Sequence, residues 1–410
     1  MNQEICQCKS CLCNASLCLP GSVEKENLHL YYLKPLQRNL LVNGPMKLGI
    51  EGPAGTGKTL VLLIKIIYII REKSNYDIIL MAPTPHNIQC KNILEDNGVD
   101  VRFEETFPLQ PTNREESSTP VVRVVDIHAF AKKCTRLKLE NNRRSKEMAM
   151  LREHLFIDDM QSIFDDCEEM KETLRCLSNI CDLSNTDINV WLAYDPVQGD
   201  IGLASQLRNV IKKKFQIPDV RSLSEVLRNS HPIMKAVESE YLNDLSSYNN
   251  KHAVPFSKGH TINGPPLECH ILTESNNLSV ELQYLKETLQ TIFNQWPGIP
   301  IAILYNDIEK ERLLDVCFTA LSNLGKGVIP IETFYEQRNK LYPNQIICDS
   351  MRKVPSFEIP LVVTVATEYF HRYLMSTRAR AKLIHIQLDT DFFYIEEMKE
   401  QYPNARFIIT

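Results

Sequence analysis

Gly52 to Thr59 combine residue types and a spacing that could bind a phosphate group. The segment fits the pattern G-x-x-x-x-G-K-[ST] at every fixed position. Its glycines allow backbone N–H groups to curl around an anion. Lys58 can then reach the β- and γ-phosphates of a nucleotide, while the Thr59 hydroxyl can ligate Mg²⁺. A glycine-rich turn without a ligand is the alternative. The residues expected to contact the nucleotide are Gly52, Pro53, Ala54, Gly55, Thr56, Gly57, Lys58 and Thr59.

The flanking residues predict the elements that would position this loop. An apolar strand at Leu48–Glu51 precedes it, and an apolar helix at Leu60–Ile70 follows. The positive end of the helix dipole would face the anion, so the context favours a nucleotide site. Gln37 lies fifteen residues before Gly52. Its amide can read the adenine edge, but it could equally be a polar residue on a helix face.

Two further strands end in polar residues. The segment Leu155–Ile157 is followed by Asp158 and Asp159, and the strand at Asn189–Ala193 is followed by a polar segment that ends at Gln198. Strand ends of a parallel sheet share one edge, so these side chains should lie beside the glycine-rich loop. Asp158 could hold Mg²⁺ through water, and Asp159 could lie near an attacking water. Residues 47–200 alternate strand and helix, which predicts a mostly parallel α/β sheet.

The pattern of strands and helices begins again after about residue 216. Apolar strands are expected at Cys269–Leu272, Ile301–Leu304, Gln345–Cys348, Leu361–Ala366 and Leu383–Gln387, with helices at Ser279–Phe293 and Asp307–Asn323. This half has no phosphate loop, but it carries Arg228, Arg378 and Arg380. A lone arginine is usually a surface residue. In a second sheet domain, such arginines could supply positive charge to a γ-phosphate across a cleft.

Composition limits the class of protein. A chain of 410 residues is long enough for two or three domains. No apolar run is long enough to span a membrane, and the N-terminus lacks the pattern of a secretory signal. Because the net charge is −5, a nucleic-acid partner would need a local basic groove. The basic segment from Lys132 to Lys146 could contact a phosphate backbone or form a solvated face.

The cysteines indicate an intracellular compartment, either nucleus or cytoplasm. There are thirteen, and five of them lie in the first eighteen residues, at 6, 8, 11, 13 and 18. Without a signal peptide, disulfides are not expected. The cluster could bind a metal through thiolates, but it lacks two separated C-x₂-C pairs. A disordered cysteine-rich tail is the alternative for residues 1–24.

Nine stretches, taken in order, resemble the motifs of superfamily 1 helicases. The chain looks most like the C-terminal helicase-like region of Schlafen-type proteins, over roughly residues 33–388. The segments that carry the resemblance are Gln37, Gly52–Thr59, Ala82–Asn87, Ile127–Phe130, Ile157–Gln161, Tyr194–Gln198, Arg228, Ser350–Val363 and Thr377–Arg380.

This resemblance implies two RecA-like P-loop NTPase domains with mostly parallel sheets, at 25–215 and 216–410, and ATP with Mg²⁺ in the cleft between them. Single-stranded DNA or RNA would cross the top of both. The implied catalytic residues are Lys58, Asp159, Gln198, Arg228 and Arg378. Glu358 joins Gln37 and the glycine-rich loop as a nucleotide contact, Thr59 and Asp158 hold the metal, and Thr84, His128 and Phe130 contact nucleic acid. Phe130 could instead be a core aromatic.

Three departures from the family pattern bear on activity. Asp159 replaces the usual glutamate, Ser356 replaces a glycine before Glu358, and the short spacing between motifs leaves no room for large accessory subdomains. The shorter carboxylate at 159 would sit about 1.5 Å further back, a displacement that can cost ~10²-fold in rate. We therefore expect an ATP-dependent helicase or translocase on single-stranded nucleic acid. The main alternative is an ATP-binding switch with little hydrolysis. A GTPase or small-molecule kinase is disfavoured, since there is no Asn-Lys-x-Asp motif.

Overall fold

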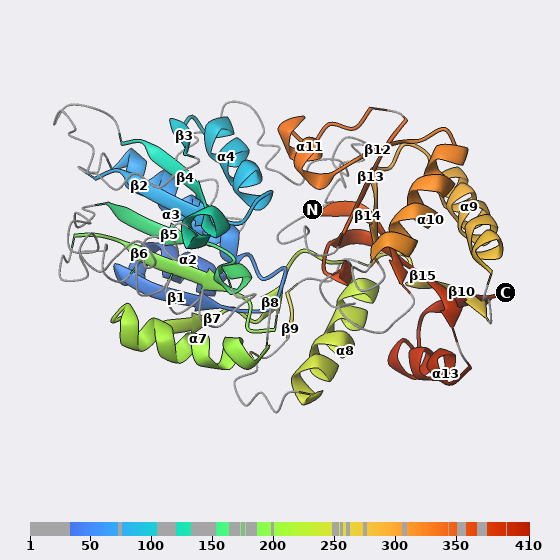
Figure 1. Ribbon diagram of the computed structural model, residues 1–410. Helices are drawn as coiled ribbons and strands as arrows, with labels where there is room; N and C mark the ends of the chain where they lie inside the picture. The colour runs from blue at the N-terminus through green and yellow to red at the C-terminus, as the bar shows by residue number, and fades with distance from the viewer. Residues whose placement is uncertain are drawn as a thin grey trace, which may run out of the picture.

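Two parallel β-sheets organise the chain, and helices flank both of them (Figure 1). The structure is a computed structural model. It describes residues 33–72, 76–104, 120–132, 153–163, 173, 177, 187–197, 201–247, 254, 257–259, 263–273, 277–305, 310–342, 344–350, 358–366, 375–390 and 392–410. The cysteine-rich segment 1–24 lies outside these residues. None of the described helices is long and apolar enough to cross a membrane.

The first sheet contains the glycine-rich loop. Its strands run in the order β3-β4-β2-β5-β6-β1-β7, and every described pairing within it is parallel. They are β1 (Lys47–Glu51), β2 (Ile78–Ala82), β3 (Val101–Glu104), β4 (Val122–Asp126), β5 (His154–Ile157), β6 (Val190–Tyr194) and β7 (Val220–Ser222). The accompanying helices are α2 (Pro35–Asn43), α3 (Lys58–Arg71), α4 (His86–Asp96), α7 (Ile201–Lys214) and the short 3₁₀ helix η2 (Met160–Ile163).

Both faces of this sheet are covered, which explains why its strands are continuous apolar runs. Successive residues of β2 enter different cores: Ile79 and Met81 pack with Leu155 on one face. Ile78 and Leu80 pack on the other face, with the apolar surface of α3. The predicted Leu60–Ile70 helix is confirmed as part of α3 and begins two residues earlier.

The second sheet has the order β12-β13-β11-β14-β15-β10-β16, again with every described pairing parallel. Its strands are β10 (Glu268–Thr273), β11 (Ile301–Tyr305), β12 (Gly327–Ile329), β13 (Gln345–Ser350), β14 (Ile359–Ala366), β15 (Ala379–Thr390) and β16 (Arg406–Ile409). The flanking helices are α8 (His231–Ser247), α9 (Leu278–Gln295), α10 (Lys310–Asn323), α11 (Ile331–Glu336) and α13 (Phe392–Gln401). A small separate pair joins β8 (Glu225–Val226) to β9 (Ser257–Lys258).

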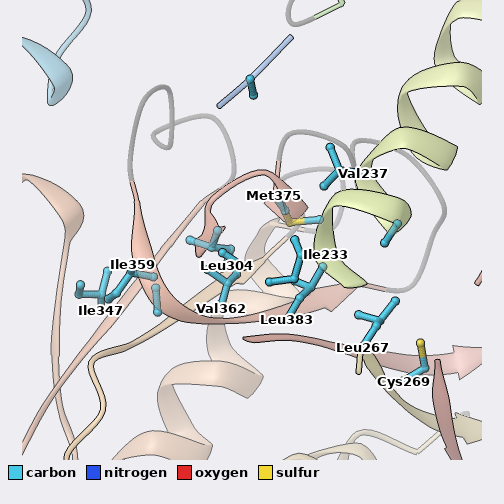
Figure 2. Close-up of a cluster of buried hydrophobic side chains, with 14 of the residues drawn as sticks. Ile233, Val237, Leu267, Cys269, Leu304, Ile347, Ile359, Val362, Met375 and Leu383 are labelled. Atoms are coloured by element: carbon cyan, nitrogen blue, oxygen red, sulfur yellow. The ribbon is translucent and has the colours of Figure 1, made fainter. Parts of the chain in front are cut away.

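Helix α8 belongs to the second core. Ile233 and Val237 on this helix lie in one buried cluster with Met375 and Leu383 (Figure 2). Both predicted mostly parallel sheets are present in the structure, so this prediction is confirmed. The first sheet extends past residue 215, because β7 pairs with β1.

The two halves contact each other through helices as well as through the connecting chain. Helix α11 of the second half lies against α4 of the first (Figure 1), where the Asn92 amide donates to the Tyr335 carbonyl at 2.9 Å. The Tyr335 hydroxyl also donates to Gln89 Oε1 at 3.3 Å. Ala54 of the glycine-rich loop and Val197 join the buried cluster of the second half. Groups from both halves therefore surround the glycine-rich loop.

Candidate functional site

The glycine-rich loop lies between β1 and α3, as its sequence predicts. Gly55 and Gly57 both have φ of +82°, a left-handed conformation that glycine adopts without a steric penalty. Gly57 is also the N-cap of α3, so the unpaired N–H groups of the first helical turn face the loop. A Cβ atom at Gly57 would lie only 2.5 Å from Gln37 Nε2. Glycine is thus required here by conformation and by packing.

Lys58 is folded back onto the loop that it follows. Its ammonium group donates to the Gly52 carbonyl at 2.8 Å and to the Pro53 carbonyl at 3.1 Å. Only 7% of the residue is exposed. Burial lowers the pKa of Lys58, while the nearby carboxylates of Asp195 and Asp159 act against that shift. An anion in the loop would supply the negative charge that this buried ammonium favours.

Gln37 braces the loop directly. Its amide nitrogen donates to the Thr56 carbonyl at 2.8 Å, and its carbonyl oxygen accepts from the Lys34 backbone at 3.0 Å. The Thr56 hydroxyl in turn donates to the Pro53 carbonyl at 2.9 Å. A glutamine amide has one further N–H and one further lone pair. The predicted contact with adenine can therefore coexist with this structural role.

Asp158 and Asp159 lie together at the carboxyl end of β5. Both are buried, and Asp158 Oδ1 accepts from the Asp159 backbone N–H at 3.0 Å. Asp159 has φ of +49°, a left-handed conformation that is rare for residues other than glycine. Aspartate and asparagine are enriched there, because their short side chains can form local hydrogen bonds.

Gln161 connects the two acidic strand ends, a role that the sequence did not assign. Its amide nitrogen donates to Asp159 Oδ1 at 3.2 Å, and its carbonyl oxygen accepts from the Asp195 backbone at 3.0 Å. Asp195 Oδ1 also accepts from the Val197 backbone at 2.9 Å. The sequence did contain a signal for a role of Gln161 at this site, since it is the glutamine of the Asp-Asp-x-Gln segment. Gln198, one residue past Val197, lies outside the described residues.

A second unassigned residue, His86, contacts Asp158 from the start of α4. Its Nε2 lies 2.8 Å from Asp158 Oδ2, and its Nδ1 lies 3.3 Å from Gln89 Oε1. Burial alone would lower the pKa of the imidazole. The Cys90 and Asp158 side chains outweigh burial, so the pKa lies well above its usual range. An N–H at Nε2 donates to Asp158 and orients its carboxylate, while Nδ1 faces the Gln89 side-chain oxygen.

Arg228 and Arg380 share one carboxylate, that of Glu358. Arg228 Nη1 lies 2.5 Å from Glu358 Oε1, and Arg380 Nη2 lies 2.6 Å from Glu358 Oε2. Burial opposes ionisation, but the two guanidinium groups prevail and lower the pKa of Glu358 to about 2. The three side chains therefore form a charged group with a net charge of about +1, which could attract an anion.

This charged group is tied to the glycine-rich loop by the chain itself. The Leu227 N–H donates to the Gly55 carbonyl at 2.9 Å, and the Ser230 N–H donates to the Arg380 carbonyl at 2.9 Å. The segment 227–230 therefore contacts the loop on one side and β15 on the other. Arg378, which the sequence also proposed as catalytic, is only 1% exposed. Of the two motif arginines, Arg380 is the one that joins Glu358.

The predicted nucleic-acid contacts differ in their surroundings. Thr84 is exposed beyond the end of β2, and its backbone N–H donates to Asp126 Oδ2 at 2.9 Å. His128 is partly exposed after β4. Phe130 is 2% exposed and belongs to a core of the first sheet. Its ring therefore takes the core position that the sequence left open, and it is not placed to stack on a base. Within the basic segment 132–146, only Lys132 is described.

Comparisons with solved structures place the fold among known ones. The chain resembles S. cerevisiae Dbp5 bound to Gle1 and IP6, with a TM-score of 0.54 and 14% identity, over 91% of this chain and 87% of that one. Dbp5 bound to Nup159, Gle1, IP6 and ADP gives 0.52 and 13%, over 94% and 93%. An arterivirus nonstructural protein 10 (helicase) aligns with a TM-score of 0.40 and 13% identity, over 89% of this chain. This chain spans 64% of that viral protein's length.

No family model matches the chain, and no curated protein matches it in sequence. At these low identities, the likeness to Dbp5 shows the fold. The chain has a fold of two RecA-like domains, each built on a parallel sheet with flanking helices.

Proposed function

We propose that this protein is an ATP hydrolase that uses closure of its two RecA-like domains to move along single-stranded DNA or RNA. One observation carries the proposal. The segment 227–230 hydrogen-bonds to the glycine-rich loop and to β15, so the loop and the group formed by Arg228, Glu358 and Arg380 lie at one site. The motif order further supports membership of superfamily 1 and a resemblance to Schlafen-type proteins. The lack of a secretory signal pattern supports a place of action in nucleus or cytoplasm.

The loop residues would hold the phosphates of ATP. Lys58 would exchange the Gly52 and Pro53 carbonyls for phosphate oxygens, which satisfies its buried charge better than neutral acceptors do. The first N–H groups of α3 would add further donors. Thr59 and Asp158 supply oxygen ligands of the kind that Mg²⁺ prefers, and His86 holds Asp158 in place. Bound Mg²⁺ would neutralise phosphate charge.

Asp159 would accept the proton of the attacking water, with Gln198 orienting that water. Gln161 holds the Asp159 carboxylate by a hydrogen bond, which limits its rotation. Arg228 and Arg378 would stabilise the negative charge that develops on the phosphate, with Glu358 positioning Arg228. Arg380 shares Glu358, so we add it to this group. Thr84 and His128 would contact the nucleic-acid strand.

An ATP-binding switch with little turnover is the second candidate. The observation that favours it is the ion pair between the Glu358 carboxylate and Arg228. An arginine that stays with Glu358 would not reach the phosphate, and the two domains would then close around ATP without hydrolysing it.

An ATPase assay with a panel of DNA and RNA strands tests the proposal. We expect hydrolysis that single strands stimulate, and its loss in Lys58→Ala. A matched control is Lys399→Ala, which removes a lysine from an exposed ion pair with Glu396 on α13. Measurable ATP affinity without phosphate release would favour the switch. ATP hydrolysis that is stimulated by none of the DNA or RNA strands would rule out movement along nucleic acid.

A further inference from the structure

We propose that His86, Cys90 and Asp158 form a binding site for Zn²⁺, and that zinc bound there prevents Asp158 from serving the nucleotide site. The donor atoms of these three residues all lie within 4.8 Å of one another. All three side chains are buried, with residue exposures of 1%, 0% and 1%. Zinc binding itself does not depend on the proposed function. Only its effect on ATP hydrolysis rests on that proposal.

The backbone brings these three residues together for independent reasons. His86 and Cys90 are four residues apart on α4, so their side chains lie on the same face, one turn apart. Asp158 follows β5, which pairs with β2, the strand that leads towards α4. The His86 ring therefore lies between the thiol and the carboxylate. Its Nε2 is 3.4 Å from Cys90 Sγ and 2.8 Å from Asp158 Oδ2.

These distances are close to those of a zinc centre. With Zn–N of about 2.0–2.1 Å and Zn–S of about 2.3 Å, tetrahedral geometry separates the nitrogen and sulfur by about 3.6 Å. The nitrogen and a carboxylate oxygen would be about 3.4 Å apart. The nitrogen–sulfur distance therefore needs almost no change, and the sulfur and the carboxylate oxygen, which lie within 4.8 Å of each other, would settle at about 3.6 Å. The His86–Asp158 pair needs to open by about 0.6 Å, which small side-chain rotations allow.

Charge and ligand type select the metal. A thiolate, a carboxylate and a neutral imidazole together carry two negative charges, which balance a divalent cation in a buried place. Binding would release the thiol and imidazolium protons to solvent. Mg²⁺ prefers six oxygen ligands, whereas Zn²⁺ accepts sulfur, nitrogen and oxygen in a four-coordinate site. Three protein ligands leave a fourth position for water.

Zinc at this site would compete with magnesium for one residue. Asp158 Oδ1 already accepts the Asp159 N–H, and zinc would hold Oδ2. Zinc on Oδ2 would place a second divalent charge beside the carboxylate and so weaken its attraction for Mg²⁺. We therefore expect low concentrations of Zn²⁺ to inhibit ATP hydrolysis, and a chelator to restore it.

Cobalt binding tests the site without nucleotide. Co²⁺ takes the place of Zn²⁺ and gives a thiolate-to-metal charge-transfer band in the near ultraviolet. The parent protein should be the full chain with the five N-terminal cysteines changed to serine, because those thiols could bind metal themselves. We expect one equivalent of Co²⁺ to produce the band, and Zn²⁺ to displace it. Cys90→Ala should abolish the band, and His86→Ala should weaken Zn²⁺ binding by more than about 100-fold, since even an outer-shell loss costs 10–100-fold.

The control is Cys317→Ala, which removes a buried thiol from α10 in the second half. It should keep both the band and the zinc affinity. Thermal midpoints without metal establish that each variant folds, and Cys90→Ser serves if the alanine variant does not. A parent without a cobalt band, or a band that persists in Cys90→Ala, would overturn the site. If cobalt binds but the protein hydrolyses no ATP, the proposed function fails and the zinc site stands.

Discussion

Replacing Asp159 with asparagine tests whether its carboxylate is the general base. The substitution removes the charge but keeps the shape of the side chain. Asparagine tolerates the φ of +49° that Asp159 adopts. Its amide oxygen can still accept from Gln161 Nε2, which lies 3.2 Å from Asp159 Oδ1. The fold and the link to Gln161 should therefore survive.

The expected loss follows from the role of a base. A positioned general base contributes about 10²- to 10⁴-fold to a rate. At 1.36 kcal/mol per decade this is about 2.7–5.4 kcal/mol of transition-state stabilisation. Asp159→Asn opens no cavity and keeps the contact with Gln161, but it removes a carboxylate that offsets the burial of the Lys58 ammonium, so the free energy of unfolding should fall by about 0.5–3 kcal/mol.

The measurement is kcat for ATP hydrolysis with saturating single-stranded nucleic acid, together with the affinity for ATP. Asp159→Asn should lower kcat and leave ATP binding within a few-fold. Asp159→Glu is the matched variant, because glutamate is usual at this position in the superfamily 1 helicases that the sequence resembles. An ordinary side chain in the left-handed region costs about 1–2 kcal/mol, so this variant should be less stable despite keeping its charge. An unchanged kcat in Asp159→Asn would refute the assignment of the base.

Three further predictions address the surroundings of the site. Gln161→Leu should lower the free energy of unfolding by about 2–3 kcal/mol, measured by urea titration, because it leaves the Asp195 N–H without its acceptor. Glu268 has its pKa lowered to about 2 by hydrogen bonds from His270 and Lys382. Glu268 therefore contributes roughly 3 kcal/mol to the free energy of unfolding above pH 4.5, and this contribution is lost as the pH falls towards 2. In Glu268→Gln, the urea midpoint of unfolding should depend less on pH between pH 6 and pH 3. Arg338→Ala should cost under about 1 kcal/mol, and nothing at high salt, because its ion pairs to α4 are exposed.

The sequence predicted the elements well because local patterns specify them. Apolar runs that end at glycine, proline or acidic residues marked both sheets, and all five strands expected in the second half are present. The glycine-rich loop was also predictable, since Gly55 and Gly57 stand where the backbone needs a positive φ. Such features depend on neighbours within a few residues.

These local patterns could not predict contacts between residues that are far apart in the sequence. His86 and Asp158 are 72 residues apart, and Arg228 and Glu358 are 130 apart. The first pair forms because β2 and β5 end at one edge of a sheet, and the second joins the segment after β8 to the residue before β14. No local spacing records which side chain turns towards which. Phe130 illustrates the same limit, since an aromatic after a strand fits a core as well as a binding surface.

The arginine–glutamate group explains how a nucleotide could move one domain against the other. Glu358 holds Arg228 and Arg380 through its two oxygens, as a phosphate would. An arriving γ-phosphate carries more negative charge than one carboxylate, so it competes for Arg228. Because the neighbouring Leu227 N–H is bonded to Gly55, a shift of Arg228 also pulls on the glycine-rich loop. Because Ser230 is bonded to β15, the same shift acts on the second sheet. Exchange of one carboxylate for one phosphate at Arg228 would therefore bias both domains at once, which is the coupling that a two-domain motor or switch requires.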